Sequence, residues 1–567
     1  MQIDKTEFMS VDTETSGLNW FLGDRAFAII TGDEQGNTRY IEMGVDDYMP
    51  VSLDLKSEVY KKVFFNAKFD IIMLDPKIFP VYGEIHDVMI MAHVYNPTEP
   101  KKSLKVLSQK YLGISPDEQE VLKTYMLKHK ITNYQHVPRE IMEPYARKDA
   151  LITMKLFNFY REKGLLEDPV YKNEMRLMQS LIKMQQRGVL IDTAFCAHES
   201  KECETRLAVI EKEVHDNYGA MNLNSAHDLA DFLFNKANLP CVSYTEKGNP
   251  SMDKKQMSKY AHPIIPIVME YRKLSKIKET YLDNFIKLSD TDNVIHCDLF
   301  QTGAVTGRFS CHDPNLQNIP RNTLVDVRKA FTCRPDYSNY YFDYSQIELR
   351  VLAHYSKEDK MISELTKEGG DLHAMTAAAL FTEVTKQNRE IAKRLNFGII
   401  YGIGGKKFVT TLDELAPELS YSEADAKTFI AKYYSNYPMV QEFVTTVKSK
   451  IYTKGFVFDI YGRKYSVSPD EAYKAVNYLI QGCSAGILKN AMIKIHDYLL
   501  DKKSNLLLCI HDEVIIEVHK DEEFVVPVIK DLMEDYKTFR VPIKVNIKKT
   551  DTNWSEAKEI SLIHQQA

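Results

Sequence analysis

The chain has 567 residues, of which 44% are hydrophobic and 27% are charged, as in an ordinary globular protein. This length predicts several domains rather than one core. No apolar run reaches the roughly 18 residues of a transmembrane helix, and the N-terminus has no signal-peptide pattern. We therefore expect a cytoplasmic protein with no membrane partner.

The cysteines and the net charge narrow the class only slightly. The 8 cysteines are scattered without a C-x-x-C pair, which argues against a zinc module and against a disulfide framework. The net charge of −6 does not indicate a nucleic-acid-binding protein. Carboxylate clusters can offset local basic surfaces, however, so composition leaves open both a metabolic enzyme and a nucleic-acid enzyme.

The first chemical signal is a pair of carboxylates on a predicted strand over residues 8–15. Segments 26–31 and 38–43 are candidate hairpin partners, separated by a turn rich in Gly and Asn. Asp12 and Glu14 are two apart in an extended chain, so both side chains face the same way. Like charges at that distance are unfavourable unless a cation or proton lies between them. A lone pair of this kind is more often a solvated strand face, so the prediction depends on further partners.

Two later segments supply candidate partners. A predicted strand at 63–66 leads to Asp70 and then a helical run, and Tyr145 and Asp149 lie four apart on a predicted helix, where they share a face. Four carboxylates and a tyrosine are the inventory of a two-metal phosphodiesterase, in which one ion activates water and the other stabilises the leaving oxygen.

In this order, the motifs D-x-E, N-x-x-x-D and Y-x-x-x-D resemble the 3′–5′ proofreading exonuclease domain of DNA polymerases. The resemblance implies a ribonuclease-H-like mixed sheet flanked by helices over residues 1–165. It implies Tyr145 as the residue that orients the water, Asn66 as part of the second motif, and Leu18 as a wedge against the terminal base. The implied metal ligands are Asp12, Glu14, Asp70 and Asp149. Because the pattern is intact, we expect an active exonuclease.

Residues 166–300 have a helical texture. Apolar spacing predicts a helix over 175–187 that ends at Gly188, and further helices follow to about 218, after Ser225 and around 271–281. A basic cluster occupies the last of these. It is either a solvated helix face or a surface that follows phosphates, and the sequence leaves both open. Its members are Arg272, Lys273, Lys276 and Lys278.

A second carboxylate pair is predicted in the C-terminal half. Residues 340–343 form an aromatic, strand-like run that breaks at Asp343, and helical spacing starts at Ile347. A strand-terminal Asp is usually a cap or turn residue. Residues 506–518, however, read as two apolar strands that meet at the acidic turn of His511, Asp512 and Glu513. On neighbouring strands, Asp343 and Asp512 would form a second two-metal site.

A cationic and aromatic stripe lies between these two segments. Arg389, Lys393, Phe397 and Tyr401 step by four along a predicted helix. Aromatic stripes are usually core, but two cations on the same stripe are hard to bury. This favours a surface that meets phosphates at one end and a base at the other. Loop 301–321 and the helix around 477–481 add Arg and amide side chains, which can reach phosphates and minor-groove acceptors.

The motifs D-Y-S-Q-I-E-L-R, R-x-x-x-K-x-x-x-F-x-x-x-Y-G and H-D-E-V resemble, in order, family A DNA polymerases, the bacterial DNA polymerase I large-fragment type and its phage relatives. The resemblance covers essentially the whole chain. It implies a right-hand polymerase domain over 166–567, with a thumb at about 175–290, a palm at about 291–350 and 465–567, and fingers at about 351–464. The chain starts at the exonuclease, so we expect no 5′ nuclease domain and a phage-like replicative role. One departure is Glu390, where the bacterial type often has a basic residue.

The resemblance implies attack of a primer 3′-hydroxyl on the α-phosphorus of a deoxynucleoside triphosphate. Asp343 and Asp512 would hold two Mg²⁺ ions, for which Mn²⁺ could substitute, and Lys393 would protonate pyrophosphate. Arg389, Lys393 and His373 would neutralise the triphosphate. The implied nucleotide-binding residues are Arg389, Lys393, Phe397, Tyr401, His373 and Glu348, the last as a steric gate against a ribose 2′-hydroxyl. The implied DNA-binding residues are Arg308, Asn315, Gln317, Asn477, Gln481 and His511.

The expected partners are primer–template DNA and deoxynucleoside triphosphates, with a helicase, a primase or a single-strand-binding protein as further candidates. Two rival interpretations remain. The chain could be a nuclease whose polymerase half only binds DNA, or a non-catalytic DNA-binding scaffold. Erosion of Asp343, Asp512 or Lys393 would favour the first rival, and all three residues are present.

Overall fold

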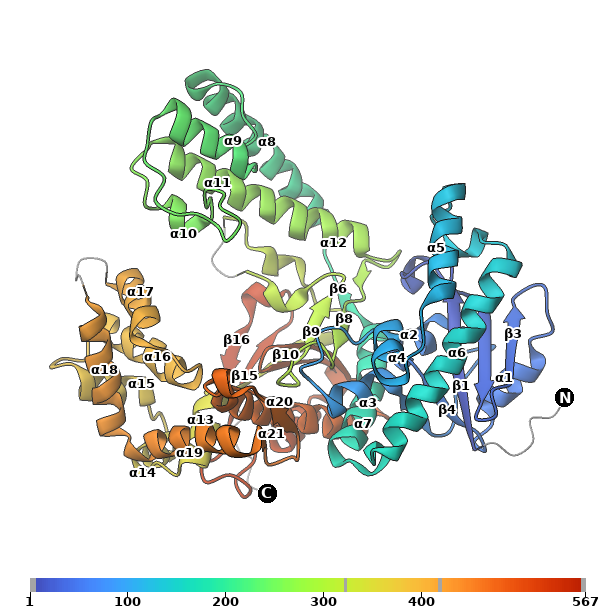
Figure 1. Ribbon diagram of the computed structural model, residues 1–567. Helices are drawn as coiled ribbons and strands as arrows, with labels where there is room; N and C mark the ends of the chain where they lie inside the picture. The colour runs from blue at the N-terminus through green and yellow to red at the C-terminus, as the bar shows by residue number, and fades with distance from the viewer. Residues whose placement is uncertain (1–6, 321–323, 417–420, 562–567) are drawn as a thin grey trace.

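The computed structural model describes residues 7–320, 324–416 and 421–561. Figure 1 shows a sheet domain formed by the N-terminal part at one side of the molecule. A second, larger part has a central sheet, with one group of helices projecting away from it and another gathered beside it (Figure 1). Within the described ranges, no helix combines the length and apolar character needed to cross a membrane.

The N-terminal domain is built on a mixed sheet with strand order β3-β2-β1-β4-β5, where β1 pairs antiparallel with β2 and parallel with β4. The predicted strands at 8–15, 26–31 and 38–43 are confirmed. The strand predicted at 63–66 ends earlier, because Asn66 adopts a left-handed backbone (φ 70°) where the chain turns into the next helix. The strands are β1 (Phe8–Thr15), β2 (Ala26–Asp33), β3 (Thr38–Glu42), β4 (Lys61–Phe64) and β5 (Ile85–Asp87).

Helices cover this sheet, and the longest of them crosses β1 and β2. Its inner face buries Met142, Tyr145, Ala146 and Ala150 against Ile30 of β2. The predicted helix that carries Tyr145 and Asp149 is therefore confirmed. The helices are α1 (Met49–Lys56), α2 (Ala67–Met73), α3 (Val88–Tyr95), α4 (Leu104–Leu112), α5 (Asp117–His129) and α6 (Arg139–Glu162).

Helix α7 (Pro169–Arg187) joins the two parts and belongs to both hydrophobic cores. The Asp168 carboxylate caps its N-terminus by accepting hydrogen bonds from the backbone N–H groups of Val170 and Tyr171. One set of its side chains, which includes Tyr171, packs in the N-terminal core, whereas Leu177 and Leu181 pack in the core of the larger part. This shared helix fixes how the two parts meet.

Two buried ionic clusters hold α7 in place. In the first, the Glu174 carboxylate accepts hydrogen bonds from Lys489 Nζ (2.7 Å) and Gln301 Nε2 (2.7 Å) and forms an ion pair with Arg463. Burial raises the pKa of Glu174, but the two cations outweigh burial and hold it below its ordinary value. Buried charges are tolerated only when they are paired in this way.

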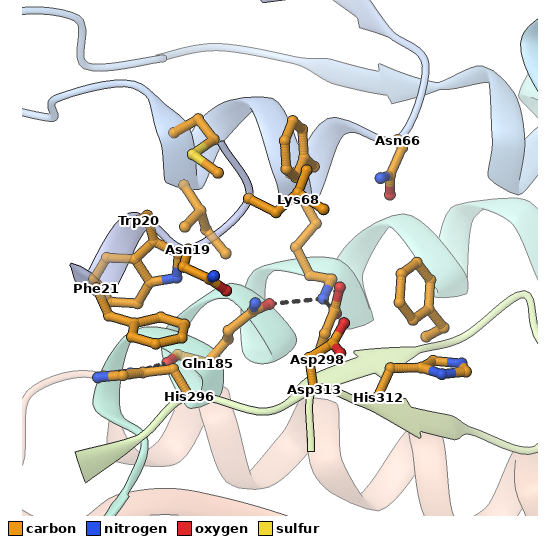
Figure 2. Close-up of a pocket in the computed structure, with 15 residues that line it drawn as sticks. Asn19, Trp20, Phe21, Asn66, Lys68, Gln185, His296, Asp298, His312 and Asp313 are labelled. Atoms are coloured by element: carbon orange, nitrogen blue, oxygen red, sulfur yellow. Dashed lines mark hydrogen bonds and ion pairs between the residues drawn. The ribbon is translucent and has the colours of Figure 1, made fainter. Parts of the chain in front are cut away.

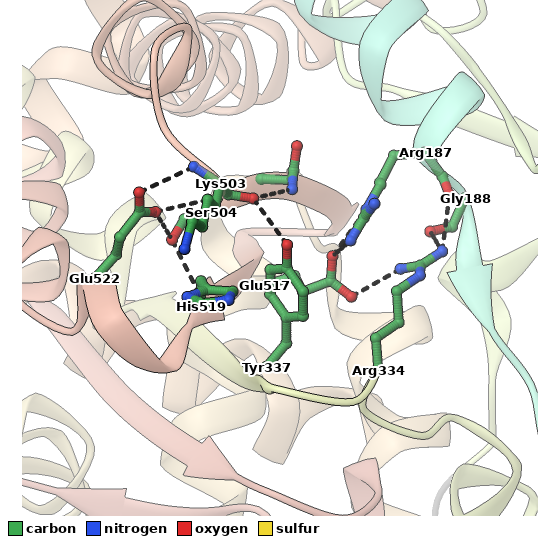
Figure 3. A network of polar contacts seen from close by, with 10 residues as sticks. Arg187, Gly188, Arg334, Tyr337, Lys503, Ser504, Glu517, His519 and Glu522 are labelled. Atoms are coloured by element: carbon green, nitrogen blue, oxygen red, sulfur yellow. Dashed lines mark hydrogen bonds and ion pairs between the residues drawn. The ribbon is translucent and has the colours of Figure 1, made fainter.

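The second cluster holds the C-terminal end of α7, as Figure 3 shows. Arg187 Nε and Arg334 Nη1 each donate to the buried Glu517 carboxylate at 2.8 Å. Arg334 Nη2 also donates to the carbonyl oxygens of Arg187 (2.9 Å) and Gly188 (3.1 Å). A guanidinium thus satisfies helix-terminal carbonyls and ties the helix to the central sheet.

The central sheet of the larger part has strand order β13-β14-β10-β15-β16, with β10 in the middle. Tyr340, Tyr341 and Phe342 are buried, and Asp343 lies opposite Glu513 of β14 and Asn546 of β15. The predicted hairpin at 506–518 is confirmed as β13 and β14. The strands are β10 (Tyr337–Tyr344), β13 (Asn505–Ile510), β14 (Glu513–His519), β15 (Val545–Thr550) and β16 (Lys558–Ile560).

Helices α8 to α12 project from the central sheet toward the top of Figure 1, and α14 to α19 gather beside the sheet at the left. The remaining helices are α8 (Thr193–Tyr218), α9 (Ala226–Ala230), α10 (Lys254–Met257), α11 (Ile264–Lys276), α12 (Asp283–Leu288), α13 (Ile347–Ser356), α14 (Asp359–Thr366), α15 (Leu372–Leu380), α16 (Lys386–Ile400), α17 (Gly405–Leu415), α18 (Glu423–Asn436), α19 (Pro438–Lys454), α20 (Lys474–Leu499) and α21 (Val525–Met533). The short strands are β6 (Val189–Leu190), β7 (Val294–Ile295), β8 (Asp298–Phe300), β9 (Ser310–His312), β11 (Phe456–Phe458) and β12 (Lys464–Ser466).

Removing the Glu174 carboxylate tests the first cluster. We expect Glu174→Ala to lower the free energy of unfolding by about 3–5 kcal/mol, because Lys489 and Arg463 would be left buried without a counter-charge. Glu167→Ala is the matched control, since Glu167 is 85% exposed and forms a surface ion pair with Lys172, and we expect a change below about 0.5 kcal/mol. Urea denaturation of both variants measures the difference, and equal losses would contradict the assigned role.

Candidate active sites

The first site lies on the N-terminal sheet and combines residues from three elements. Strand β1 carries Asp12 and Glu14, α2 carries Asp70, and α6 carries Tyr145 and Asp149. Glu14, Asp70 and Asp149 are buried, with 6%, 3% and 6% of their surface exposed. The Thr13 backbone N–H (3.1 Å) and hydroxyl (2.7 Å) both donate to Asp70 Oδ1, which ties α2 to the strand between the two β1 carboxylates.

The carboxylates of this site carry more negative charge than their surroundings neutralise. Burial raises the pKa of Asp12 to about 7, although Lys105 lowers it. Burial together with Asp12 and Asp70 raises the pKa of Glu14 well above its ordinary value. Burial and Asp12 do the same to Asp70. Each of these carboxylates therefore favours a proton or a cation beside it.

A residue that the sequence analysis missed neutralises part of this charge. Lys105, on α4, is buried and forms an ion pair with Asp149, and its Nζ lies 4.6 Å from the centroid of the Tyr145 ring. The available signal was weak, because Lys105 falls with Leu107 and Ser108 on the buried side of α4. A lysine in that position is usually a snorkelling side chain.

The donor chemistry of this site fits a divalent cation. Its side chains offer hard carboxylate oxygens with excess negative charge, which are the ligands that Mg²⁺ and Mn²⁺ take. Within the described ranges, no three or more His, Cys, Asp or Glu side chains already form a group that could hold a metal ion. The ammonium group of Lys105 pairs with Asp149, which is one of the predicted metal ligands.

A cavity of about 420 Å³ lies between the N-terminal domain, which lines it with residues 18–21 and α2, and the β8–β9 hairpin. Leu18, which is 73% exposed, and Asn66 both line it. Figure 2 shows Phe21 lying over His296, with ring centroids 5.1 Å apart, and Lys68 reaching Gln185 at 2.7 Å. Leu18, the predicted wedge against the terminal base, and Asn66 of the second motif thus line the same cavity.

The second site lies at one end of the central sheet. Asp343 is near the end of β10 and Asp512 is in the tight turn between β13 and β14, where His511 adopts a left-handed backbone (φ 54°). The Tyr344 N–H donates to the Asp512 carbonyl at 3.2 Å, which holds the two segments together. The structure therefore brings Asp343 and Asp512 to the same end of the sheet, as predicted. Two carboxylates, completed by substrate oxygens, are the sparse protein ligand set that suits Mg²⁺.

Arg308 lies between Asp512 and helix α13. Its guanidinium forms an ion pair with Glu348 on α13, and its Nη2 lies 3.9 Å from Asp512 Oδ1. Burial raises the pKa of Glu348, Arg308 opposes this increase, and Asp512 adds to it. Burial also raises the pKa of Asp512, whereas Arg308 and His511 lower it. Arg308 is thus a counter-charge shared by two carboxylates.

Amide side chains from α20 approach the same region. Gln481 Nε2 donates to the Tyr401 hydroxyl at 2.9 Å, and Tyr401 is 42% exposed at the C-terminal end of α16. Asn477 lies one turn before Gln481 on α20, and its buried Oδ1 makes no hydrogen bond within the described part of the chain. Of these two amides, Gln481 contacts Tyr401 directly.

The predicted stripe on α16 is only partly exposed. Arg389 Nε donates to Asp371 Oδ2 at 2.7 Å, and Lys393 Nζ lies 3.9 Å from Glu390, with 44% of its side chain exposed. Phe397 is half-buried, with its ring centroid 5.9 Å from that of His373. The stripe therefore presents cations and an aromatic face together, as the spacing predicts.

The structure bears on His373 and on the basic cluster at 272–278. Burial lowers the pKa of His373 to about 4, and Arg389 adds to this decrease. With this pKa His373 carries little charge near pH 7 in this structure, and its contact with a triphosphate stays a prediction. In the basic cluster at 272–278, Arg272 Nε donates to the Leu223 carbonyl (2.8 Å), and Lys278 Nζ pairs with Asp283 (2.8 Å). These two side chains are engaged within the protein, and contact of the cluster with phosphates stays a prediction.

The loop residues predicted to contact DNA receive uneven support. Asn315 caps a short 3-10 turn, because its Oδ1 accepts a hydrogen bond from the Gln317 N–H at 3.1 Å. Gln317 is half-buried, and His511 is exposed at the tip of the β13–β14 turn. The DNA contacts of all three stay predictions.

These features define a class of protein that joins a nuclease-type carboxylate site to a second carboxylate site of polymerase type. The family profile described as DNA polymerase family A matches residues 193–556, and the profile described as 3′–5′ exonuclease matches residues 1–164. The chain belongs to DNA polymerase family A. The family resemblance inferred from the sequence motifs is confirmed. Members of this family and its exonuclease domains use divalent metal ions.

Several relatives match over most of the chain. DNA polymerase I of Borreliella burgdorferi is 31% identical, over 98% of this chain and 63% of its own length. DNA polymerase I of Pseudomonas aeruginosa is 29% identical, over 98% of this chain and 64% of its own. The thermostable DNA polymerase I of Thermus thermophilus is 33% identical, over 81% and 58%. The chain thus spans a little less than two thirds of the length of these relatives.

A solved structure confirms the predicted fold class. It is described as the POL domain of Pol1 from M. smegmatis in complex with DNA primer–template and dNTP, and it is 23% identical to this chain. The two structures share a TM-score of 0.81, over 96% of this chain and 96% of that one. A ribonuclease-H-like domain followed by a right-hand polymerase domain is therefore the fold of this chain.

The charge at the first site predicts a pH-dependent stability. The folded-state pKa of Asp12 is about 7, above the roughly 3.9 of an unfolded Asp, so its stabilising contribution is complete below about pH 4 and lost as the pH rises through 7. We expect Asp12→Asn to raise the melting temperature of the protein in EDTA at pH 8 by about 2–4 °C, and by less at pH 5. Differential scanning calorimetry measures this change. Asp216→Asn, at a 59% exposed side chain, is the control, and no gain at pH 8 would contradict the prediction.

Proposed function

We propose that this chain is a template-directed DNA polymerase that adds deoxynucleotides to a primer 3′ end and proofreads with a 3′–5′ exonuclease. The observation that carries the proposal is the presence of two separate carboxylate sites on one chain. One site contains Asp343 and Asp512. The other contains Asp12, Glu14, Asp70 and Asp149. The substrates are primer–template DNA and deoxynucleoside triphosphates, and each site takes two Mg²⁺ ions, for which Mn²⁺ can substitute.

In the polymerase site, Asp343 and Asp512 are the residues that hold the metal. When bound there, Mg²⁺ supplies Lewis-acid activation of the primer hydroxyl and neutralises charge on the leaving pyrophosphate. Arg389 and Lys393 attract the triphosphate from one face of α16. Lys393 is the proton donor to pyrophosphate. This role is supported by its 44% exposed side chain and by the long distance of 3.9 Å between its Nζ and Glu390.

Nucleotide selection uses the residues around α13 and the end of α16. Phe397 and Tyr401 pack against the incoming base and the templating position, and neutral His373 can donate a hydrogen bond without adding charge. Glu348 is buried, and Arg308 holds it by an ion pair. A carboxylate fixed in this way excludes a ribose 2′-hydroxyl by its bulk. Contacts to the primer terminus and the minor groove are proposed for Arg308, Asn315, Gln317, Asn477, Gln481 and His511.

In the exonuclease site, the carboxylates hold the metal and Tyr145 orients the attacking water. Burial raises the pKa of the Tyr145 hydroxyl well above its ordinary value, and Glu14 and Asp12 add to this increase, so the hydroxyl stays protonated and can donate a hydrogen bond. The unpaired primer end lies along the cavity surface beside Leu18 and Asn66. Residues 166–567 form the polymerase domain, with thumb, palm and fingers near 175–290, 291–350 with 465–567, and 351–464.

Separate inactivation of the two sites tests the proposal. We expect Asp343→Asn to reduce primer extension by at least about 10²–10³-fold while exonuclease decay of single-stranded DNA continues. Asp12→Ala is expected to do the reverse, because each variant removes a metal ligand from only one site. Radiolabelled-primer gels in Mg²⁺ measure both reactions. Asp501→Asn is the control, since Asp501 is 81% exposed.

Each rival interpretation predicts a different outcome of that assay. Primer extension that survives Asp343→Asn would overturn the polymerase site. A parent chain that degrades DNA without extending primers would indicate a nuclease with a DNA-binding half, and binding without either reaction would indicate a scaffold. Product lengths on a primed single-stranded circle, with and without a helicase, primase or single-strand-binding protein, test those candidate partners.

Two substitutions separate the bulk of the Glu348 side chain from its charge. We expect Glu348→Ala to reduce discrimination against ribonucleotides by about 10²-fold, because the space for a 2′-hydroxyl opens. Glu348→Gln keeps the bulk and loses the charge, so it should retain most of the discrimination. The ratio of kcat/KM for each dNTP to that for the matching rNTP measures the effect. Unchanged discrimination in Glu348→Ala would refute the gate.

A further inference from the structure

Lys105 is a buried cation inside a cluster of acids. Its side chain is only 11% exposed, and its ammonium group pairs with Asp149, whose side chain is 9% exposed. The negative charges of Asp12 and Glu14 on β1 also favour the charged form of Lys105. The neighbouring cation Lys148 is directed elsewhere, because its Nζ pairs with Glu118 and donates to the Ser115 carbonyl at 2.9 Å. Among the described residues, Lys105 is thus the cation paired directly with a carboxylate of this site.

The position of the ammonium group is the unusual feature. It contacts Asp149 and lies 4.6 Å from the ring centroid of Tyr145, one helical turn away on α6. A cation over an aromatic face and against a carboxylate restrains both side chains. These two side chains are the ones for which the proposed exonuclease requires a fixed geometry. A positive charge therefore already lies where a divalent cation would engage Asp149.

We propose that Lys105 is a positioning residue of the exonuclease site whose ammonium group competes with a divalent cation for Asp149. The inference rests on the proposed exonuclease function and identifies a residue that controls metal loading. In the metal-free protein, Lys105 keeps Asp149 aligned with Tyr145 and reduces repulsion within the acidic cluster. When a divalent cation binds, the ammonium group gives up Asp149, so the site fills at a higher metal concentration than its carboxylates alone would require.

Mn²⁺ binding to the full chain tests the competition. The loss of the free Mn²⁺ signal in electron paramagnetic resonance reports binding, and the component that disappears in Asp12→Ala belongs to this site. We expect Lys105→Met, an unbranched side chain without charge, to tighten that component by about tenfold, the order expected for removing a unit charge a few ångströms from the ion. Lys105→Arg keeps the charge and should bind Mn²⁺ within about twofold of the parent.

An equal or weaker Mn²⁺ affinity in Lys105→Met would overturn the proposal, since an ion pair with a purely structural role would not oppose the metal. A second measurement uses the unaltered chain and does not depend on the folding of a variant. Mass spectrometry of lysine acetylation should show faster labelling of Lys105 when Mn²⁺ is added, because the amine is released from Asp149. An unchanged labelling rate would contradict the competition.

Activity assays on the same samples distinguish this inference from the proposed function. Primer extension should be unchanged in Lys105→Met, because Lys105 makes no contact with the polymerase site. A parent chain that binds Mn²⁺ at the Asp12 site but degrades no DNA would refute the proposed exonuclease. Even then, the Mn²⁺ affinities of the parent and of Lys105→Met would show separately whether Lys105 competes with the metal.

Discussion

The arrangement of this molecule depends on the buried ion pairs of the Glu174 carboxylate. It lies on α7, the helix that both hydrophobic cores share, and it is compensated by Lys489 of α20 and by Arg463 from the turn between β11 and β12. Such a cluster adds little net stability compared with apolar packing, but its geometry tolerates few alternatives. Together with the Arg334 contacts at the other end of α7, it fixes the orientation of the exonuclease domain relative to the central sheet.

The two candidate sites solve the same electrostatic problem in similar ways. Burial raises the pKa values of Asp12, Glu14 and Asp70 in the first site and of Asp512 in the second, and a cation lies beside the carboxylates of each site. In the exonuclease site that cation is Lys105, and in the polymerase site it is Arg308, which bridges Glu348 and Asp512. The guanidinium can serve two carboxylates at once because of its planar fork, whereas the lysine acts as a point charge on one. The remaining negative charge is what favours divalent cations.

Much of the fold was predictable because its signals are local. Alternation and helical spacing predicted β1, the β13–β14 hairpin and the face of α6 that carries Tyr145 and Asp149. The strand ending at Phe64 was predicted to end two residues later, at Asn66, because a left-handed Asn66 leaves no trace in hydrophobic periodicity. The ionic contacts were not predictable. Lys105 and Asp149 are 44 residues apart, and Glu174 and Lys489 are 315 apart, so only the tertiary fold brings them together.

We propose that α7 holds the two carboxylate sites so that both can serve the same primer end. The most direct test is rapid-quench kinetics on a primer with a mismatched 3′ terminus, with dNTPs and Mg²⁺ added together with excess unlabelled trap DNA. We expect the labelled primer first to shorten and then to be extended within a single binding event. Extension of the mismatched end without prior shortening, or shortening followed by no extension in the presence of the trap, would contradict it.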